Sequence, residues 1–347
     1  MINKQKLLKT PVNQLKLSQK TTVADLVEAM GSMSIQARNI GECAQVLKNI
    51  YQDKARPIIF LGLAGPLIAA GLRRVIRDLI VSKAVDVVVS TGAIIYQDIY
   101  AALGFGHYKG TPDADDSVLR EMKIDRIYDT YIDDEKAWQT DRFCGRFADT
   151  IPAGNYSSRK FLDLLAEKID DEESILFQCK KLGVPVFVPA LNDSSIGIGL
   201  TDHRIRCDKE GRQGVVIDAI ADNCEIVEIV VKSKKTAAFY VAGGVPKNYI
   251  NDSIVMGSIY GKNKGHDYAL QITTAVTQDG GLSSSSLSEG RSWGKIKKDA
   301  KYAMAWVEPS VALPLLAGYV FGKQLTKKRK SLRMSWSEGV LKWQLKK

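Results

Sequence analysis

Short runs of β-branched and aromatic residues alternate with helical segments along this chain of 347 residues. The pattern predicts strands within the ranges 56–63, 85–91, 184–191, 214–219, 237–244 and 267–274. These runs are apolar at successive positions, which is typical of strands that are buried on both faces. We therefore expect an α/β fold with a mostly parallel sheet and helices on both of its faces.

The segments around these strands suggest a single domain. A helical stretch from about 23 to 51 precedes the first strand, and a polar insert at 107–136 separates the second strand region from the third. No internal repeat or long linker calls for a second domain, and 45% hydrophobic residues are enough for a large core. We expect one domain over 1–322, with an N-terminal helical extension, and a basic C-terminal tail over 323–347.

The net charge of +10 is concentrated in that tail. Residues 323–347 hold nine Lys and Arg against one acid, Glu338, a net of +8, which leaves the rest of the chain near +2. A solvated charge run is a more common role for such a tail than contact with RNA or an anionic membrane. We therefore expect neither a nucleic acid partner nor a membrane partner.

Targeting signals and metal motifs are absent from the sequence. The basic start lacks a continuous apolar region with a cleavage site, and the longest apolar stretch, 58–72, is short and interrupted by Pro66. Five scattered cysteines without a C-x-x-C pair suit reduced thiols, and the three histidines lie far apart. We expect a cytoplasmic protein with no metal site.

Glycine-rich turns follow several of the predicted strands. They are "GLAGPLIAAG", "STGAIIYQD", "PALNDSSIGIG" and "AGGVPKNYI". Ligands of open α/β sheets bind beyond the carboxyl ends of the strands, where free amides at a helix start can hold phosphate. None of the turns is G-x-G-x-x-G or a P-loop, and each alone is more often a tight connection. Together, at one edge of a sheet, they favour a nucleotide site.

The stretch "SEGRSWGKIKKDAKY" follows a long polar loop at 273–290, and loops of that length are usually functional or disordered. Within it, Lys295 comes directly after Trp293 and Gly294. Either this lysine is solvated at the start of an element, or apolar neighbours hold it so that it can react as an amine. The residues alone leave both interpretations open.

Four motifs resemble those of a known family. They are "SWGKI" at 292–296, "GGVPK" at 243–247, "VPVFVPALNDSSIG" at 184–197 and "QDGG" at 278–281. The chain resembles the deoxyhypusine synthases and their bacterial relatives, including homospermidine synthases, from about residue 21 to 321, and its polar insert resembles the bacterial branch. The resemblance implies a Rossmann-like fold that binds NAD, and a homotetramer of tight dimers with active sites between paired subunits.

The resemblance also implies a reaction, an aminobutyl transfer between polyamines. NAD takes hydride from the carbon beside the secondary amine of spermidine, and the four-carbon arm passes to an active-site lysine as an imine. An acceptor amine then displaces the lysine, and NADH reduces the new imine. In deoxyhypusine synthase the acceptor is a lysine of a translation factor, and in the bacterial homospermidine synthases it is putrescine.

Site residues follow from the same resemblance. Lys295 matches the covalent lysine, Trp293 matches a ring along the polyamine, and Glu289 matches an acid that binds one end of it. The residues that match cofactor contacts are Thr91, Gly92, Ala93, Asp193, Gly243, Gly244, Thr274, Ser283 and Glu308. Asp98, after the start of the helix that follows Thr91, suits a structural role.

Four positions depart from the eukaryotic pattern. Ile198 replaces a substrate-binding aspartate and Asn248 replaces a histidine base, while Leu282 and Gln97 replace acidic residues. Binding a polycation out of water needs carboxylates. We expect these from Asp279, from Glu289 or from the insert, with Trp293 and Asn248 also lining the substrate.

The main hypothesis is an NAD-dependent aminobutyl transferase of the homospermidine type. The alternatives are a deoxyhypusine synthase that modifies a protein lysine, and an NAD-binding protein of this fold that has lost polyamine catalysis.

Overall fold

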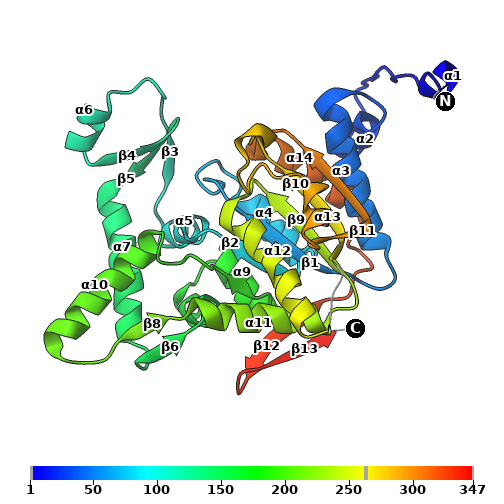
Figure 1. The fold of residues 1–347 in the computed structure, drawn as a ribbon. Helices are drawn as coiled ribbons and strands as arrows, with labels where there is room; N and C mark the ends of the chain where they lie inside the picture. The colour runs from blue at the N-terminus through cyan, green and yellow to red at the C-terminus, as the bar shows by residue number, and fades with distance from the viewer. Residues whose placement is uncertain (1–2, 262–264, 346–347) are drawn as a thin grey trace.

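A six-stranded parallel sheet forms the centre of the protein (Figure 1), in a computed structural model that describes residues 3–261 and 265–345. Its strand order is β11-β10-β9-β1-β2-β7, and every neighbouring pair is parallel. The strands are β1 (Ile58–Leu63), β2 (Val87–Ser90), β7 (Val186–Phe187), β9 (Thr236–Val241), β10 (His266–Ile272) and β11 (Ile296–Ala305). The predicted parallel sheet is confirmed.

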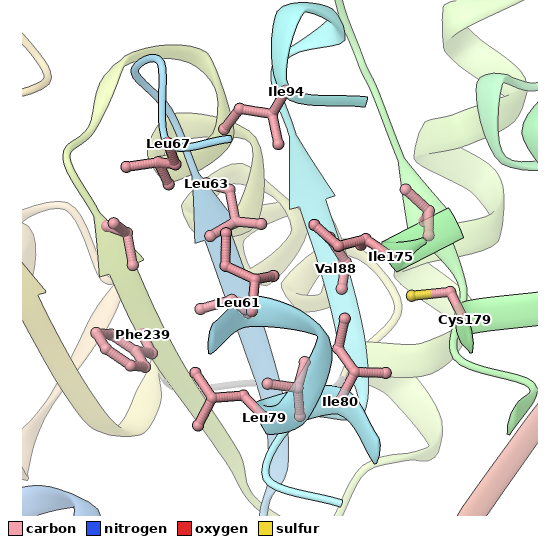
Figure 2. Packing of buried hydrophobic residues seen from close by; sticks show 14 of the residues in the cluster. Leu61, Leu63, Leu67, Leu79, Ile80, Val88, Ile94, Ile175, Cys179 and Phe239 are labelled. Atoms are coloured by element: carbon pink, nitrogen blue, oxygen red, sulfur yellow. The ribbon is translucent and has the colours of Figure 1, made fainter. Parts of the chain in front are cut away.

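Helices cover both faces of this sheet because its strands are apolar on both sides. One face packs against α2 (Val23–Met30), α3 (Ile35–Gln52), α4 (Arg73–Val81), α5 (Gly92–Ala102), α9 (Ile175–Leu182) and α14 (Pro309–Gly322). Figure 2 shows part of this core, where Leu61 and Val88 of neighbouring strands meet Ile80 of α4. The other face packs against α11 (Ala219–Lys232) and α12 (Gly244–Ile259).

The polar insert forms an outlying lobe, at the left of Figure 1. It contains α6 (Asp116–Glu121) and an antiparallel sheet of β3 (His107–Lys109), β5 (Thr130–Asp133) and β4 (Ile124–Ile127). Two long helices beside it, α7 (Asp134–Asp149) and α10 (Ser195–Glu210), pack closely. A Cβ atom on Gly145 would lie 2.4 Å from the carbonyl oxygen of Gly199, so the two backbones touch where both residues are glycine.

Four further elements follow α7 or α10 along the chain. They are α8 (Ser158–Leu165), the short 3-10 helix η1 (Ala166–Lys168), and the parallel pair β6 (Gly154–Tyr156) and β8 (Val215–Ile217). The predicted strand within 214–219 therefore exists, but it pairs with β6 in a separate sheet and does not join the central one.

The described part of the basic tail forms a packed hairpin, in contrast to the expected solvated charge run. Strands β12 (Leu332–Ser337) and β13 (Val340–Leu345) pair antiparallel across Glu338 and Gly339, which both have positive φ, as tight hairpin turns require. The side chains of Leu332, Met334 and Leu341 are buried in the core on the α11 and α12 face of the sheet.

The N-terminal helical stretch is present as two helices, α2 and α3, preceded by the short α1 (Lys4–Leu7). Across 3–261 and 265–345, no helix combines the length and the apolar character that crossing a membrane requires.

Candidate active site

Two glycine turns at the carboxyl edge of the central sheet leave no room for side chains. Gly243 precedes α12, and a Cβ atom there would lie 2.5 Å from Cα of Ser283. Gly92 begins α5, and a Cβ atom there would lie 2.3 Å from Oγ of Ser194. Amides in the first turn of a helix have no partner within the helix. These bare turns therefore fit the phosphates of a dinucleotide such as NAD.

All nine residues expected to bind the cofactor follow the carboxyl ends of strands in this sheet. They are Thr91, Gly92 and Ala93 after β2, Asp193 after β7, Gly243 and Gly244 after β9, Thr274 and Ser283 after β10, and Glu308 after β11. Glu308 also caps α14, because its carboxylate accepts from the backbone N–H of Ser310 at 2.7 Å. The topology thus gathers the predicted cofactor residues at one edge.

Lys295 lies between α13 (Glu289–Ser292) and β11, and its side chain is held rather than solvated. The residue is 8% exposed, and Nζ lies 4.7 Å from the centre of the Trp293 ring. Nζ donates to Oδ1 of Asn248 at 3.1 Å and lies 3.0 Å from Oδ1 of Asp252. Of the two interpretations left open by the sequence, the structure supports the lysine held by its neighbours.

Asn248 and Asp252 face Lys295 together because they are four residues apart on α12. Nδ2 of Asn248 donates to Oδ2 of Asp252 at 2.9 Å, so the amide and the carboxylate form one unit. Asn248 comes four residues after Gly244, which is about 6 Å along a helix. The lysine amine therefore lies about one helical turn from the glycine turn. Asp252 was not among the predicted residues, although its spacing from Asn248 would have indicated it.

A second lysine is buried beside the first. Lys247, the last residue of "GGVPK", is 2% exposed, and its Nζ donates to the carbonyl oxygen of Ser285 at 2.5 Å and to Oγ of Ser285 at 3.0 Å. Burial lowers the pKa of Lys247 to about 8, the charge of Glu289 opposes that shift, and the charge of Lys295 adds to it. The site therefore holds two buried lysines, of which only Lys295 was predicted.

Comparison with known proteins shows the family of the whole chain. The family model described as deoxyhypusine synthase matches residues 25–320. A deoxyhypusine synthase-like protein of Chlorobaculum tepidum is 42% identical over 325 residues, which cover 91% of each chain. A deoxyhypusine synthase-like protein of Coxiella burnetii is 37% identical over 334 residues, which cover 94% of this chain and 93% of the other.

The chain belongs to the deoxyhypusine synthase family. Members of this family are aminobutyl transferases, so the chain is a transferase of that kind. The crystal structure of an Entamoeba histolytica protein assigned as a deoxyhypusine synthase has the same fold, with a TM-score of 0.61 and 17% sequence identity over 90% of this chain and 97% of the other.

In this deoxyhypusine synthase-like chain, the two acids expected to bind substrate differ in how far their carboxylates are already hydrogen-bonded. Glu289 begins α13 and is exposed, close enough to influence Lys247. Asp279, at the end of the short 3-10 helix η2 (Thr277–Asp279), accepts from the backbone N–H of Gly281 at 2.7 Å and from the hydroxyl of Ser284. These bonds lower the pKa of Asp279, and they use its carboxylate to stabilise the turn of its own loop.

Asp98 has the structural role expected of it. It is fully buried, and its carboxylate accepts from Oγ of Ser174 at 2.7 Å and from the N–H of Leu176 at 2.9 Å, while Nε of Arg73 donates to it at 2.7 Å. These contacts hold the start of α9. Gln97, one of the departures from the eukaryotic pattern, accepts from the N–H of Ala69 at 3.2 Å and so ties α5 to the loop after β1.

Another departure, Ile198, lies on α10 with 59% of its surface exposed and lines a cavity of about 730 Å³ against the insert. Burial raises the pKa of Asp141 at this cavity to about 6. The aspartates that line it are Asp125, Asp134, Asp141, Asp149 and Asp202. Two acids of the insert, Asp125 and Asp134, thus line the same cavity as Ile198, together with three acids of α7 and α10. The third departure, Leu282, is 40% exposed in the loop after β10.

His203 lies beside Asp149 and Cys207, two residue types that can also bind metal ions, but both of its ring nitrogens already have hydrogen-bond partners. Nδ1 of His203 lies 2.7 Å from Oδ1 of Asp149, and Nε2 accepts from the N–H of Val215 at 3.0 Å, with Cys207 alongside. Both ring nitrogens are therefore committed, and this cluster fastens α10 to β8 and to the end of α7.

Proposed function

We propose that this chain is a cytoplasmic, NAD-dependent aminobutyl transferase that makes homospermidine from spermidine and putrescine through an imine on Lys295. The observation that carries the proposal is the placement of the Lys295 amine, buried beside Trp293 and held by Asn248 and Asp252 on the helix that begins at Gly244.

The residues of the site support distinct roles in this reaction. NAD would accept a hydride from the donor amine and return it to the product. The glycine turns before α5 and α12 would bind its phosphates. Trp293, with 44% of its surface exposed, offers a flat ring for the methylenes and cationic amines of the substrate. Asp252 and Glu289 would neutralise its ammonium groups, in place of the acids that this chain lacks.

Lys295 must be neutral to attack. Its nitrogen forms a bond to the substrate carbon as 1,3-diaminopropane leaves, and a C=N bond remains between the lysine and the four-carbon arm. Putrescine then forms a new C=N bond to that carbon and releases the lysine. Reduction of this bond gives homospermidine, so the atoms of both substrates are accounted for in the two products.

The test is mass spectrometry of purified protein incubated with NAD, spermidine and putrescine. We expect homospermidine and 1,3-diaminopropane together, and a borohydride-trapped adduct on Lys295. Lys295→Arg abolishes both products because a guanidinium cannot form the imine. Lys298→Arg, an exposed lysine of the same segment, is the matched control. Full activity of Lys295→Arg would overturn the proposal, and NAD binding without any amine product would favour a protein that has lost catalysis.

The acceptor is tested in the same experiment. A 1,3-diaminopropane signal that appears only with an added translation factor, and not with putrescine, would favour the alternative in which a protein lysine is modified.

The proposal includes a homotetramer with active sites between paired subunits. Mixing inactive Lys295→Arg chains with chains inactivated by Gly92→Trp would restore activity if Lys295 and Gly92 of one site belong to different subunits. No recovery after co-refolding would place both residues of a site on one chain.

A further inference from the structure

A cavity of about 1050 Å³ lies at the amino edge of the central sheet, opposite the glycine turns. It is bounded by residues 51–58 before β1, by residues 232–234 before β9, and by the segment 323–332 with the end of β13. Its volume is in the range of small-molecule sites. Neither the proposed transfer reaction nor the predicted cofactor residues use this edge of the sheet.

The lining of the cavity is strongly basic. Nine Lys and Arg residues line it against a single acid, Asp53, whose carboxylate is already bonded to Nζ of Lys235 and to the hydroxyl of Tyr268, both at 2.8 Å. Six of the lysines have no ion pair with any residue that the structure describes. These are Lys54, Lys232, Lys234, Lys327, Lys328 and Lys330, of which Lys232 donates to the carbonyl oxygen of Leu341. The cavity therefore concentrates uncompensated positive charge, which attracts anions.

Two arginines that line the cavity, the buried Arg329 and the partly buried Arg56, each keep one hydrogen-bond donor without an acceptor among the described residues. Arg56 and Arg329 share one buried carboxylate, Asp86, at 2.7 and 2.5 Å, so the trio carries a surplus positive charge. The side chain of Arg329 is 3% exposed, yet its Nε has no partner, and Nη1 of Arg56 also has none. Buried donors without an acceptor are costly and rare in native proteins. An anion in the cavity would offset the surplus charge of this trio.

Aromatic and apolar side chains complete the lining. Tyr51 and Trp343 lie in the same lining as the lysines, together with Ile58, Leu325 and Leu332. A free inorganic anion makes no favourable contact with aromatic and apolar side chains. A nucleotide can pack its flat base against them while its phosphates pair with the lysines and arginines.

From these observations we infer that this cavity binds a phosphate-bearing anion, of the nucleoside di- or triphosphate class. Lys327, Lys328 and Lys330 would hold the phosphates together with Arg56 and Arg329, and Trp343 would lie against the base. The inference is independent of the proposed transfer reaction, because its readout is binding and not turnover.

The test is isothermal titration calorimetry at physiological ionic strength on the full chain saturated with NAD, so that the predicted dinucleotide site is occupied. The titrants are ATP, inorganic tripolyphosphate and adenosine. We expect ATP to bind with a stoichiometry of one, tripolyphosphate to bind more weakly, and adenosine not to bind. Equal affinity for ATP and tripolyphosphate would identify inorganic phosphate chains as the ligand and overturn the nucleotide assignment.

Charge reversal separates this site from nonspecific attraction. Lys327→Glu with Lys328→Glu changes exposed side chains only, and it should weaken ATP binding at least about tenfold. The control pair, Lys16→Glu with Lys209→Glu, makes the same change in net charge on exposed residues outside the cavity and should leave the affinity within about twofold. Equal weakening in both pairs, or no ATP binding to the unmodified chain, would overturn the inference.

Trp343→Leu tests separately whether the Trp343 ring binds the base of the nucleotide. We expect it to remove the advantage of ATP over tripolyphosphate while leaving tripolyphosphate binding unchanged. Tighter binding of an RNA oligonucleotide than of ATP, lost in the Lys327→Glu, Lys328→Glu pair, would instead assign the surface to RNA.

Discussion

Oδ1 of Asp252 lies 3.0 Å from Nζ of Lys295, so the amine that we propose to form the imine is directly paired with a carboxylate. The pair holds the amine next to Trp293, and the amine has to leave this carboxylate before it can attack a substrate carbon. An incoming polyamine brings its own ammonium groups, and these can compete for Asp252. We therefore expect substrate binding to free the lysine for reaction.

Asp252→Asn should weaken polyamine binding more than it slows turnover. The change removes a charge-assisted hydrogen bond, and such bonds contribute about 1.5–3 kcal/mol, so KM for spermidine should rise about 10- to 100-fold. Steady-state kinetics measure the effect. Asp267→Asn is the control because Asp267 pairs with Lys297, 2.6 Å away, outside the site. A Michaelis constant that stays unchanged in Asp252→Asn would remove Asp252 from substrate binding.

Lys247→Met should alter the pH dependence of stability. The pKa of Lys247 is lowered by burial to about 8 in the folded chain, whereas an unfolded lysine titrates near its ordinary value of about 10.4. Folding is therefore penalised below pH 8, where the buried amine must be charged, and the penalty fades as pH rises toward the unfolded pKa.

Methionine removes that penalty but also the bond to Ser285. The free energy of unfolding of Lys247→Met, relative to the unmodified chain, should fall by about 2 kcal/mol between pH 7.5 and 9.5. Urea denaturation at several pH values measures this difference. A gap that does not change with pH would mean that Lys247 keeps an ordinary pKa in the fold.

Gly243→Ala should damage the predicted cofactor turn by steric conflict alone. The added Cβ atom meets Cα of Ser283 at 2.5 Å, and Gly243 has extended backbone that alanine can adopt. We expect a loss of about 1–3 kcal/mol in stability, and NAD affinity weakened by about tenfold or more in calorimetry. Gly31→Ala is the matched control, since its nearest neighbour would lie at an ordinary 3.4 Å. Normal NAD binding by Gly243→Ala would move the cofactor site elsewhere.

Leu341→Ala tests whether the C-terminal hairpin belongs to the core. Leu341 is 1% exposed, and truncating a fully buried leucine costs about 2–5 kcal/mol. Leu345, on the same strand, is 55% exposed, so Leu345→Ala should change stability by no more than about 0.5 kcal/mol. Chemical denaturation compares the two variants. Equal effects would show that the hairpin contributes little to the folded body.

The strands buried on both faces were predictable because their apolar runs are dense. Strand β11 was missed because lysines and Asp299 fill the stretch between the buried residues Ile296 and Ala303, as suits a strand at the edge of a sheet. The hairpin was missed because charge dominated the interpretation of its sequence. The alternation of Leu332, Met334 and Trp336 was the available signal for a half-buried strand.

The site was predictable only in part for a similar reason. Lys295 and Trp293 are near neighbours in sequence, so their meeting could be expected. Asp252 reaches the lysine across tertiary space from α12, and no pattern near Lys295 marks that helix as its neighbour. Only the four-residue spacing of Asp252 from the predicted Asn248 could have indicated it. The pairing of β8 with β6 could not be predicted for the same reason, because tertiary packing determines which strand lies beside β8.

The placement of Asn248 and Asp252 bears on how a family like this diversifies. Asn248 and Asp252 lie one turn apart on α12, after the glycine turn, while Ile250 and Ile254 of the same helix are buried in the core. If the proposed function holds, we expect substitutions at the two polar positions to alter the amine that is accepted, while the fold and the predicted cofactor turn stay unchanged. With such a helix, substrate specificity could change through two residues while the rest of the structure stays the same.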